Sequence, residues 1–222
     1  MAGHETTELW LIRHGESEAN ADGRLQGQSD FPLTARGHQQ ARSLGESLRR
    51  KTFASLYTSD LQRAADTADA IARALDLPAV QDPRLREIDT GDWSGLTAQE
   101  ARERFPEEWK RWESRDPDLR RGGGESYRDA CARVTLCLME LAARHPGERV
   151  LVVFHGAVIR AYLAWVMDLP LSRIFHLTVS NASVSRVRPF MSAIPGDQPR
   201  SGRILCINDL AHLRDPAMVS GG

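Results

Sequence analysis

Apolar and polar positions change period along the chain in a way typical of an α/β protein. Short apolar runs rich in Val, Leu and Ile predict buried strands, and longer stretches with apolar residues every three or four positions predict amphipathic helices. The two kinds of element alternate, which favours a mostly parallel sheet with helices on both faces, a three-layer sandwich. The expected strands cover residues 8–13, 54–58, 79–82, 150–154, 183–188 and 204–208, and the expected helices cover 34–50, 60–75, 97–113, 125–145 and 157–167.

Two segments refine this α/β fold. Residues 191–202 contain two Pro and two Gly and predict a hairpin connection, so we expect the last strand to be an antiparallel edge strand. The expected helix at 125–145 carries one apolar stripe, and this stripe is typical of core packing rather than chemistry. The stripe consists of Ala130, Val134, Cys137, Leu138 and Leu141.

The length of 222 residues suits one α/β domain with a sizeable core. We expect this domain to span residues 1–222, with frayed ends at 1–7 and 216–222. Residues 89–124 interrupt the strand–helix alternation, and we expect them to form an excursion that faces the substrate.

Composition narrows the class of partner. The formal net charge of −1 gives no global basic field for nucleic acid or acidic membranes. The three cysteines are odd in number and form no Cys-x-x-Cys pair, which favours reduced thiols in a cytoplasmic protein. The polar N-terminus has no signal-peptide pattern, and no apolar run approaches membrane-spanning length. We therefore expect a small-molecule partner, no nucleic acid and no membrane, with homodimer formation left open.

Residues 12–20, Ile-Arg-His-Gly-Glu-Ser-Glu-Ala-Asn, follow the first expected strand directly. Gly15 permits a close backbone turn around a ligand, and Arg13 offers a planar fork of donors that matches phosphoryl oxygens. A neutral His14 ring can attack phosphorus and form a phosphohistidine that water later opens. A lone Arg-His-Gly is a short motif, so this interpretation needs support from the rest of the chain.

Two further segments supply that support. Arg63 lies in the first turn of an expected helix that follows a strand, with Ser59 and Gln62 at capping-box spacing, although most arginines are simply solvated. His155 and Gly156 form a second His-Gly at the end of an apolar strand, where a core histidine is the usual alternative. Because ligands bind at the carboxyl ends of strands in open α/β sheets, these side chains converge with His14 if their strands are neighbours.

Glu87 stands in a turn-rich loop, residues 84–95, ahead of a second capping box at Thr97 and Glu100. Its carboxyl group can give a proton to a leaving alkoxide, which no arginine can do, but an ordinary surface glutamate is the simpler interpretation. The seven histidines are scattered, and no Asp or Glu pairing has a metal-ligand spacing. We therefore expect neither a metal nor another cofactor.

Taken together, the motifs resemble those of the histidine phosphatase superfamily, the phosphoglycerate-mutase-like enzymes, from about residue 8 to about residue 213. The motifs in their order are Arg13-His14-Gly15-Glu16-Ser17 with Asn20, residues 25–30 with 32–34 and Gly37, residues 59–67 with Arg63, residues 85–95 with Glu87, Gly124-Glu125-Ser126, His155-Gly156 and Asn181-Ala182-Ser183. Several motifs in one order are far more specific than any single motif.

The resemblance implies a role for each matching residue. It implies that His14 is the phosphorylated nucleophile, that Glu87 is the proton donor, and that Arg13, Arg63 and His155 hold the phosphoryl group. It also implies that the phosphate pocket includes Asn20, Gln26, Gly27 and Gly156. Two arginines and a histidine can stabilise the charge of phosphoryl transfer without Mg²⁺.

The chain departs from the family pattern at three places, and the last two favour the phosphatase branch over the mutase branch. Phe154 replaces the small residue that is common before the second His-Gly, and it either narrows the pocket floor or packs behind it. Ala157 stands where mutases have Asn, and residues 101–121 do not match the mutase insertion. We therefore expect a metal-independent phosphomonoesterase, a histidine acid-type phosphoric monoester hydrolase. A phosphoglycerate-mutase-type phosphotransferase and a catalytically silent phosphoester-binding module are the alternatives.

Substrate choice is expected to lie in residues 89–124. This segment holds aromatic and basic side chains suited to a sugar or to the carboxylate of a small phosphoester: Trp93, Trp109, Trp112, Arg111, Arg115, Arg120 and Arg121. Trp109 and Trp112 lie on one helical face, which favours packing for this pair. The resemblance leaves phosphorylated sugars, glycosyl phosphoglycerates, phosphoserine and the phosphate ester of a cobalamin precursor as candidate substrates.

Overall fold

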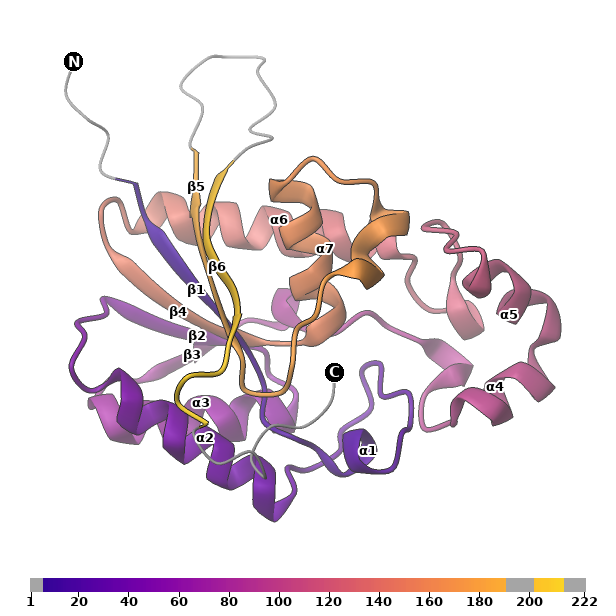
Figure 1. The fold of residues 1–222 in the computed structure, drawn as a ribbon, viewed down its shortest axis with the longest axis horizontal. Helices are drawn as coiled ribbons and strands as arrows, with labels where there is room; N and C mark the ends of the chain where they lie inside the picture. The colour runs from indigo at the N-terminus through magenta and orange to yellow at the C-terminus, as the bar shows by residue number, and fades with distance from the viewer. Residues whose placement is uncertain (1–5, 191–201, 214–222) are drawn as a thin grey trace.

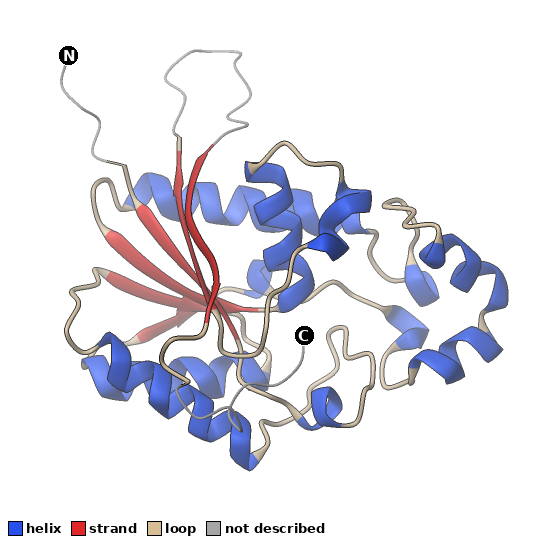
Figure 2. Cartoon of the chain, viewed as in Figure 1, coloured by secondary structure: helices blue, strands red, loops and turns tan. Residues whose placement is uncertain are grey.

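Parallel strands form the centre of the sheet in the computed structural model, which describes residues 6–190 and 202–213. Within these residues the six-stranded sheet has the order β3-β2-β4-β1-β5-β6 (Figure 2). The strands β1, β2, β3 and β4 are parallel, whereas β5 is antiparallel to β1 and β6 is antiparallel to β5. The strands are β1 (Glu8–Arg13), β2 (Ser55–Thr58), β3 (Ala79–Gln81), β4 (Arg149–Phe154), β5 (Val184–Pro189) and β6 (Gly202–Asp209).

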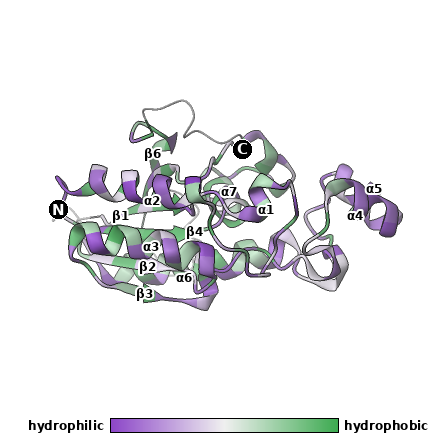
Figure 3. Ribbon diagram, turned by 90° about the horizontal axis from the view of Figure 1, so that it is seen from below, coloured by the Kyte–Doolittle hydropathy of each residue, from purple (hydrophilic) through white to green (hydrophobic). Residues whose placement is uncertain are grey.

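Helices cover both faces of the sheet (Figure 1). Alternate residues of β1 point to opposite faces, so that Trp10 and Ile12 pack against one pair of helices and Leu9 and Leu11 against the other. The first pair is α2 (Ala35–Leu48) and α3 (Gln62–Leu75), and the second is α6 (Tyr127–Arg144) and α7 (Gly156–Val166). Figure 3 shows the apolar strands enclosed between these layers. The expected three-layer α/β fold is confirmed.

The predicted elements agree with the structure to within a few residues. The expected edge strand is confirmed as β6, but β5 also runs against its neighbour β1, which the sequence pattern did not indicate. The expected helix at 97–113 is divided into α4 (Ala98–Arg104) and α5 (Pro106–Glu113), because Pro106 has no N–H to continue a helix. The hairpin connection expected at 191–202 lies, apart from Gly202, outside the described residues.

The remaining elements are short and lie near the carboxyl ends of the strands or on the excursion. They are α1 (Glu18–Ala21), η1 (Pro83–Leu85), η2 (Gly91–Trp93), η3 (Arg121–Gly123) and η4 (Leu171–His176). In Figure 1, α4 and α5 lie well away from the sheet, at the opposite end of the molecule from the start of β1. Residues 89–124 therefore include the two helices that lie farthest from the sheet.

One capping prediction is confirmed and one is wrong. Thr97 and Glu100 form the expected capping box of α4. The N-cap of α3 is Leu61, without a side-chain cap, so Ser59 and Gln62 form no capping box. At the N-terminus, Thr7 is buried and donates hydrogen bonds to the carbonyls of Ala142 and His145, so the expected fraying does not extend to Thr7.

Candidate active site

The adjacent strands β1 and β4 place two histidines side by side at their carboxyl ends. His14 follows β1 and His155 follows β4, and the centroids of the two rings lie 5.2 Å apart. The backbone N–H of His14 donates to the carbonyl of Phe154 at 3.0 Å, which continues the strand pairing up to the histidines. Both side chains are buried. The expected convergence of these two strand ends is present.

The tautomer of His14 is fixed by the backbone of the next residue, Gly15. Nδ1 lies 2.6 Å from the carbonyl oxygen of Gly15, and because a carbonyl can only accept, Nδ1 carries the proton. Burial, followed by the charges of Arg63 and Arg13, lowers the pKa of His14 well below its ordinary value. The ring is therefore neutral at neutral pH, with Nε2 as its basic nitrogen.

His155 is held by a residue that follows the neighbouring strand β2. Its Nε2 lies 2.8 Å from Oγ of Ser59, the residue that was expected to cap α3. Its Nδ1 is buried without a protein partner among the described residues, which suits a ligand atom. Burial, followed by the charge of Arg63 and by His14, lowers the pKa of His155 well below its ordinary value.

Two guanidinium groups flank the histidines and are oriented by backbone carbonyls. Arg13 Nη1 donates to the carbonyl of Val179 at 2.6 Å, and Arg63 donates to those of Ser29 and Gly27, both at 2.8 Å. Burial is the main cause that lowers the pKa of each arginine to about 10, so both stay charged at neutral pH. Since a carbonyl carries no net charge, both cations remain available to an anion.

Glu87 lies at the N-terminus of α7 rather than on the surface. Its carboxylate oxygens accept the backbone N–H groups of Ile88, Ala157 and Val158 at 2.9, 3.1 and 3.3 Å. Free N–H groups at a helix N-terminus favour a negative charge, so this end of α7 is occupied by the protein's own carboxylate. A carboxyl group is thereby fixed beside the second His-Gly.

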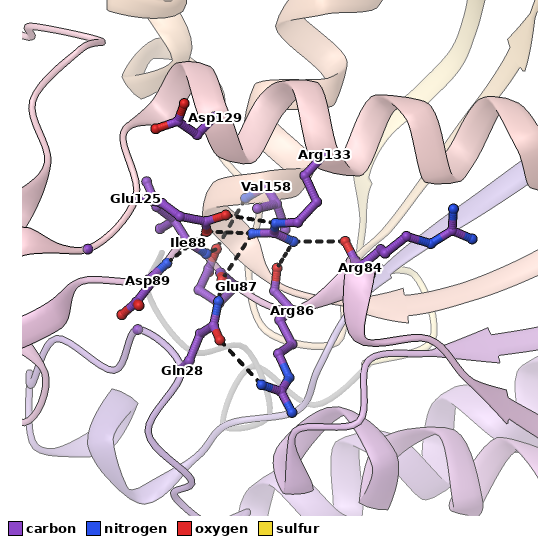
Figure 4. Close-up of polar contacts among 12 residues, drawn as sticks. Gln28, Arg84, Arg86, Glu87, Ile88, Asp89, Glu125, Asp129, Arg133 and Val158 are labelled. Atoms are coloured by element: carbon purple, nitrogen blue, oxygen red, sulfur yellow. Dashed lines mark hydrogen bonds and ion pairs between the residues drawn. The ribbon is translucent and has the colours of Figure 1, made fainter.

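The loop that carries Glu87 is tied to α6 by one arginine (Figure 4). Arg133 donates to the carbonyls of Arg84 and Arg86 at 2.8 and 3.0 Å and forms a two-point ion pair with Glu125 at 2.8 and 2.6 Å. Glu125 in turn accepts the backbone N–H of Asp89 at 3.1 Å. Residues on both sides of Glu87 are therefore fixed to the same side-chain pair.

A cavity of about 220 Å³ opens over these groups. Nearly all of the predicted site residues line it: Arg13, His14, Asn20, Gln26, Gly27, Arg63, Glu87 and Gly156. His155 lies outside this lining and is fully buried. The oxygen of Asn20 accepts from Ser17 and from Asn181, so its N–H groups are what Asn20 can offer a ligand. The predicted residues therefore gather around one small polar cavity.

Three glycines of the predicted site have packing or backbone roles in the structure. At Gly15 a side chain would meet the backbone of Gly37 on α2, so close packing against α2 requires a glycine at this position. Gly27 has a φ of +51° and presents its carbonyl to Arg63. Gly156 lies against the Arg13 side chain, with an added Cβ 3.1 Å from its Nε. Gly27 and Gly156 therefore support the two arginines, and Gly15 allows close packing against α2.

Some lining residues were not predicted from the sequence. Tyr127, Arg160 and Phe175 line the cavity, as does Ala157, whereas Phe154 is fully buried in the core and packs behind the site. Arg160 lies four residues after Gly156 on α7, a spacing that places it one turn further on the same face and is a usable sequence signal. Phe175 comes from η4, and no local pattern connects it to the site.

No group of three or more His, Cys, Asp or Glu side chains within residues 6–190 and 202–213 is arranged to hold a metal ion. In the same part of the chain, none of the helices has the length and apolarity needed to cross a membrane.

Comparison with known proteins gives consistent results. The sequence profile described as histidine phosphatase superfamily (branch 1) matches residues 9–192. Phosphoserine phosphatase 1 of Hydrogenobacter thermophilus is 36% identical over 92% of this chain and 93% of its own. The probable phosphoglycerate mutase GpmB of an Enterobacter species is 34% identical, over 95% and 97%. The solved structure of mycobacterial glucosyl-3-phosphoglycerate phosphatase with VO3 has a TM-score of 0.78 and 31% identity, over 90% and 98%.

Proposed function

Since the chain belongs to branch 1 of the histidine phosphatase superfamily, we propose that it is a metal-independent phosphomonoesterase that hydrolyses a small phosphorylated metabolite through a phosphohistidine. The observation that carries this proposal is the His14 ring, neutral by burial and with Nδ1 bonded to the Gly15 carbonyl. A ring held in this way directs the lone pair of Nε2 at a phosphoryl group bound between Arg13 and Arg63.

In the first step Nε2 of His14 forms a bond to phosphorus while the bond from phosphorus to the ester oxygen breaks. The charge on the equatorial oxygens is stabilised by Arg13, Arg63 and His155, and the leaving oxygen takes a proton from Glu87.

In the second step water attacks the phosphohistidine and releases inorganic phosphate. Glu87, now a carboxylate, accepts the proton of the attacking water, so one side chain acts first as acid and then as base. The three backbone N–H groups that Glu87 accepts in the structure suit this carboxylate form. His14 returns to its neutral state.

We further propose that the enzyme is of the acid type. Burial and the neighbouring arginines keep the pKa of His14 well below that of an ordinary histidine. The nucleophile therefore stays neutral in mildly acidic solution, and activity persists at pH values where exposed histidines are protonated.

A mutase is the second candidate, because a relative named as a probable phosphoglycerate mutase is almost as similar as the phosphatase relative. A mutase returns the phosphoryl group to its substrate, whereas a phosphatase passes it to water. Ala157 lines the cavity where the mutase branch has Asn, which favours the phosphatase.

Incubation of the protein with a panel of phosphate esters in EDTA separates these candidates. Phosphate release supports the phosphatase, isomerised product supports the mutase, and binding without turnover supports a catalytically silent module. Vanadate and inorganic phosphate should compete with substrate, since both resemble the bound phosphoryl group.

The nucleophile is tested by His14→Ala. This variant should fold and lose turnover, and native mass spectrometry after a phosphoester pulse should show a phosphate adduct on the wild type only. Acid quenching is unsuitable because phosphohistidine is acid-labile. Turnover by the variant, or an absolute need for Mg²⁺ after EDTA treatment, would overturn the proposal.

A further inference from the structure

The turn at residues 180–183 contains Asn181-Ala182-Ser183, a motif of the sequence to which the proposed mechanism gives no role. The turn directly precedes β5, and β5 runs antiparallel to β1 with Val184 opposite Ile12. Because the two strands run in opposite directions, the start of β5 lies beside the end of β1. The turn therefore lies next to the loop that carries His14.

Backbone hydrogen bonds continue the pairing of these two strands beyond their ends. The N–H of Arg13 donates to the carbonyl of Ser183 at 3.2 Å, and the N–H of Ala182 donates to the carbonyl of His14 at 3.0 Å. The turn itself is closed by the N–H of Ser183, which donates to the carbonyl of Ser180 at 3.0 Å. The position of the turn relative to His14 is thus set by the backbone.

The side chain of Asn181 reaches from this turn into the loop that follows β1. Asn181 is 1% exposed, and its Nδ2 lies 3.2 Å from the carbonyl oxygens of both His14 and Gly15. The same nitrogen lies 3.0 Å from Oδ1 of Asn20. A carbonyl oxygen can only accept, so the atom that faces these oxygens is the amide nitrogen, and it donates to them.

The carbonyl of Gly15 links Asn181 to the nucleophile. This oxygen lies 2.6 Å from Nδ1 of His14 and also accepts from the amide of Asn181. The hydrogen bond that one ring nitrogen makes decides which of the two carries the proton. By holding the carbonyl in place, Asn181 supports the bond that leaves Nε2 of His14 unprotonated.

Asn20 is the second group that Asn181 orients. Its Oδ1 lies 3.2 Å from the backbone nitrogen of Ser17 and 3.0 Å from Nδ2 of Asn181, and both of these nitrogens donate to it. Two donors on the oxygen leave the amide nitrogen of Asn20 for a ligand, and Asn20 lines the cavity. Asn181 therefore contacts the supports of two side chains that line the cavity.

Other side chains hold the same loop in a different way. The N–H of Gly15 donates to Oγ1 of Thr67 at 3.1 Å, and the N–H of Glu16 donates to Oε1 of Gln40 at 2.8 Å. These bonds fix backbone N–H groups of the loop. The bonds of Asn181 instead end on the carbonyl that receives the His14 ring and on a cavity side chain.

We propose that Asn181 is a positioning residue for phosphoryl transfer, which holds the Gly15 carbonyl against the His14 ring. Through the same amide it turns the N–H groups of Asn20 toward the phosphoryl group. Small displacements of a reacting group lower the rate strongly, so a residue that fixes the nucleophile affects kcat without touching the substrate. The proposal rests on the proposed phosphatase function.

The ¹⁵N NMR spectrum of the His14 ring tests this role directly. At neutral pH the wild type should show a protonated Nδ1 and an unprotonated Nε2, whereas Asn181→Ala should populate both tautomers. Asn208→Gly is the matched control, because Oδ1 of Asn208 holds the same turn by accepting the N–H of Ser180 at 2.7 Å. Glycine suits the φ of +57° at this position, and the control should keep the wild-type spectrum.

Kinetics and phosphate binding measure the consequences. Asn181→Ala should lower kcat on aryl and alkyl phosphates alike by roughly 10- to 100-fold, the range for a lost buried hydrogen-bond partner, and Asn208→Gly should lower it less than threefold. Calorimetry with inorganic phosphate tests the part played by Asn20. Since Asn181 acts through Asn20, adding Asn181→Ala to an Asn20→Ala protein should weaken phosphate binding no further.

The tautomer and the binding of phosphate are measured without turnover, which separates this proposal from the phosphatase mechanism. A wild type that hydrolyses no ester but shows both expected responses keeps the positioning role and removes the phosphatase function. An unchanged His14 tautomer in Asn181→Ala, with or without a loss of kcat, would overturn the proposal, as would additive losses in phosphate binding.

A thermal melt of each variant identifies any that fails to fold. If Asn181→Ala does not fold, Asn181→Ser decides, because serine keeps a small polar group in the buried position but is shorter than asparagine. It should show the same mixture of His14 tautomers and a loss of kcat in the same range. A wild-type tautomer in a folded Asn181→Ser protein would contradict the proposal.

Discussion

The arginines at the strand ends and the arginines on the surface of the excursion are held by different partners. Arg13 and Arg63 donate to backbone carbonyls at 2.6 to 2.8 Å, whereas Arg111 and Arg120 pair with carboxylates of Asp116 and Asp129. A carbonyl fixes the orientation of a guanidinium but leaves its charge in place. A carboxylate fixes the orientation and cancels the charge.

This difference shows where in the molecule a positive charge is left uncompensated and can stabilise an anion. At the surface, water screens an ion pair, and such pairs contribute little to stability. Near His14, burial lowers the pKa of both carbonyl-bound arginines to about 10, because no nearby carboxylate is strong enough to offset the loss of water. We propose that an incoming phosphoryl group supplies the missing negative charge, so that the folded protein is prepared for an anion before one arrives.

The largest effect should come from a carbonyl-bound arginine. Arg63→Met removes one donor to the developing charge and should lower kcat/KM for every phosphoester by about 10²- to 10³-fold, or about 3 to 4 kcal/mol. Arg111→Met removes an exposed, carboxylate-paired arginine and should change kcat/KM less than twofold. Steady-state kinetics on aryl and alkyl phosphates checks both variants, and comparable losses for the two would end the distinction between the two groups of arginines.

The next effect separates charge stabilisation from proton transfer. Glu87→Gln keeps the size of the side chain and removes the proton that the leaving oxygen needs. We expect about a hundredfold loss on alkyl phosphates but less than tenfold on aryl phosphates, because a phenolate leaves without a proton. A plot of rate against leaving-group pKa should therefore steepen in the variant. An unchanged slope would show that Glu87 is not the acid.

The residues at the carboxyl ends of the strands could be predicted from the sequence because their signal is local. His14 and His155 each follow an apolar strand and precede a glycine, so the sequence itself marks the edge of the sheet at which they meet. The strand order β2-β4-β1 then brings the two histidines and Arg63 together. The reversed direction of β5 has no such local mark, since it depends on pairing with β1 across the whole chain.

Residues whose role depends on tertiary contacts could not be predicted from the sequence in this way. Ser59 has the spacing of a helix cap, but its hydroxyl lies 2.8 Å from His155, a partner 96 residues away. Trp109 and Trp112 look equivalent in the sequence, yet Trp109 packs against Trp93 while Trp112 lines the cavity. Only the path of the excursion over the site decides which of these residues a ligand meets.

A smaller effect is expected from the residue that holds the Glu87 loop. Arg133→Met leaves the carbonyls of Arg84 and Arg86 without a donor and Glu125 without its ion pair, so the Glu87 loop should become less well fixed. We expect about a tenfold loss in kcat on alkyl phosphates, a smaller loss on aryl phosphates and little change in KM. Arg128→Met, on the same helix but exposed and paired with Asp118, is the control. Equal losses on both ester types would mean that Arg133 is structural only.

The smallest expected effect concerns the dependence of stability on pH. The pKa values of His14 and His155 are well below the ordinary value in the folded protein, whereas in the unfolded chain both titrate near about 6.5. Below that pH the unfolded chain binds more protons, so the free energy of unfolding falls as the pH falls, by up to about 1.4 kcal/mol per pH unit for each histidine. This contribution to stability is fully present above the pKa of the unfolded chain, and it is lost as the pH falls to the pKa of the folded protein.

Urea denaturation between pH 7.5 and 5 should show a shallower fall in the free energy of unfolding for His14→Ala than for the wild type. The exposed His176→Ala variant should keep the wild-type slope, and a His14→Ala slope equal to that of the wild type would show that His14 is not held neutral by the fold.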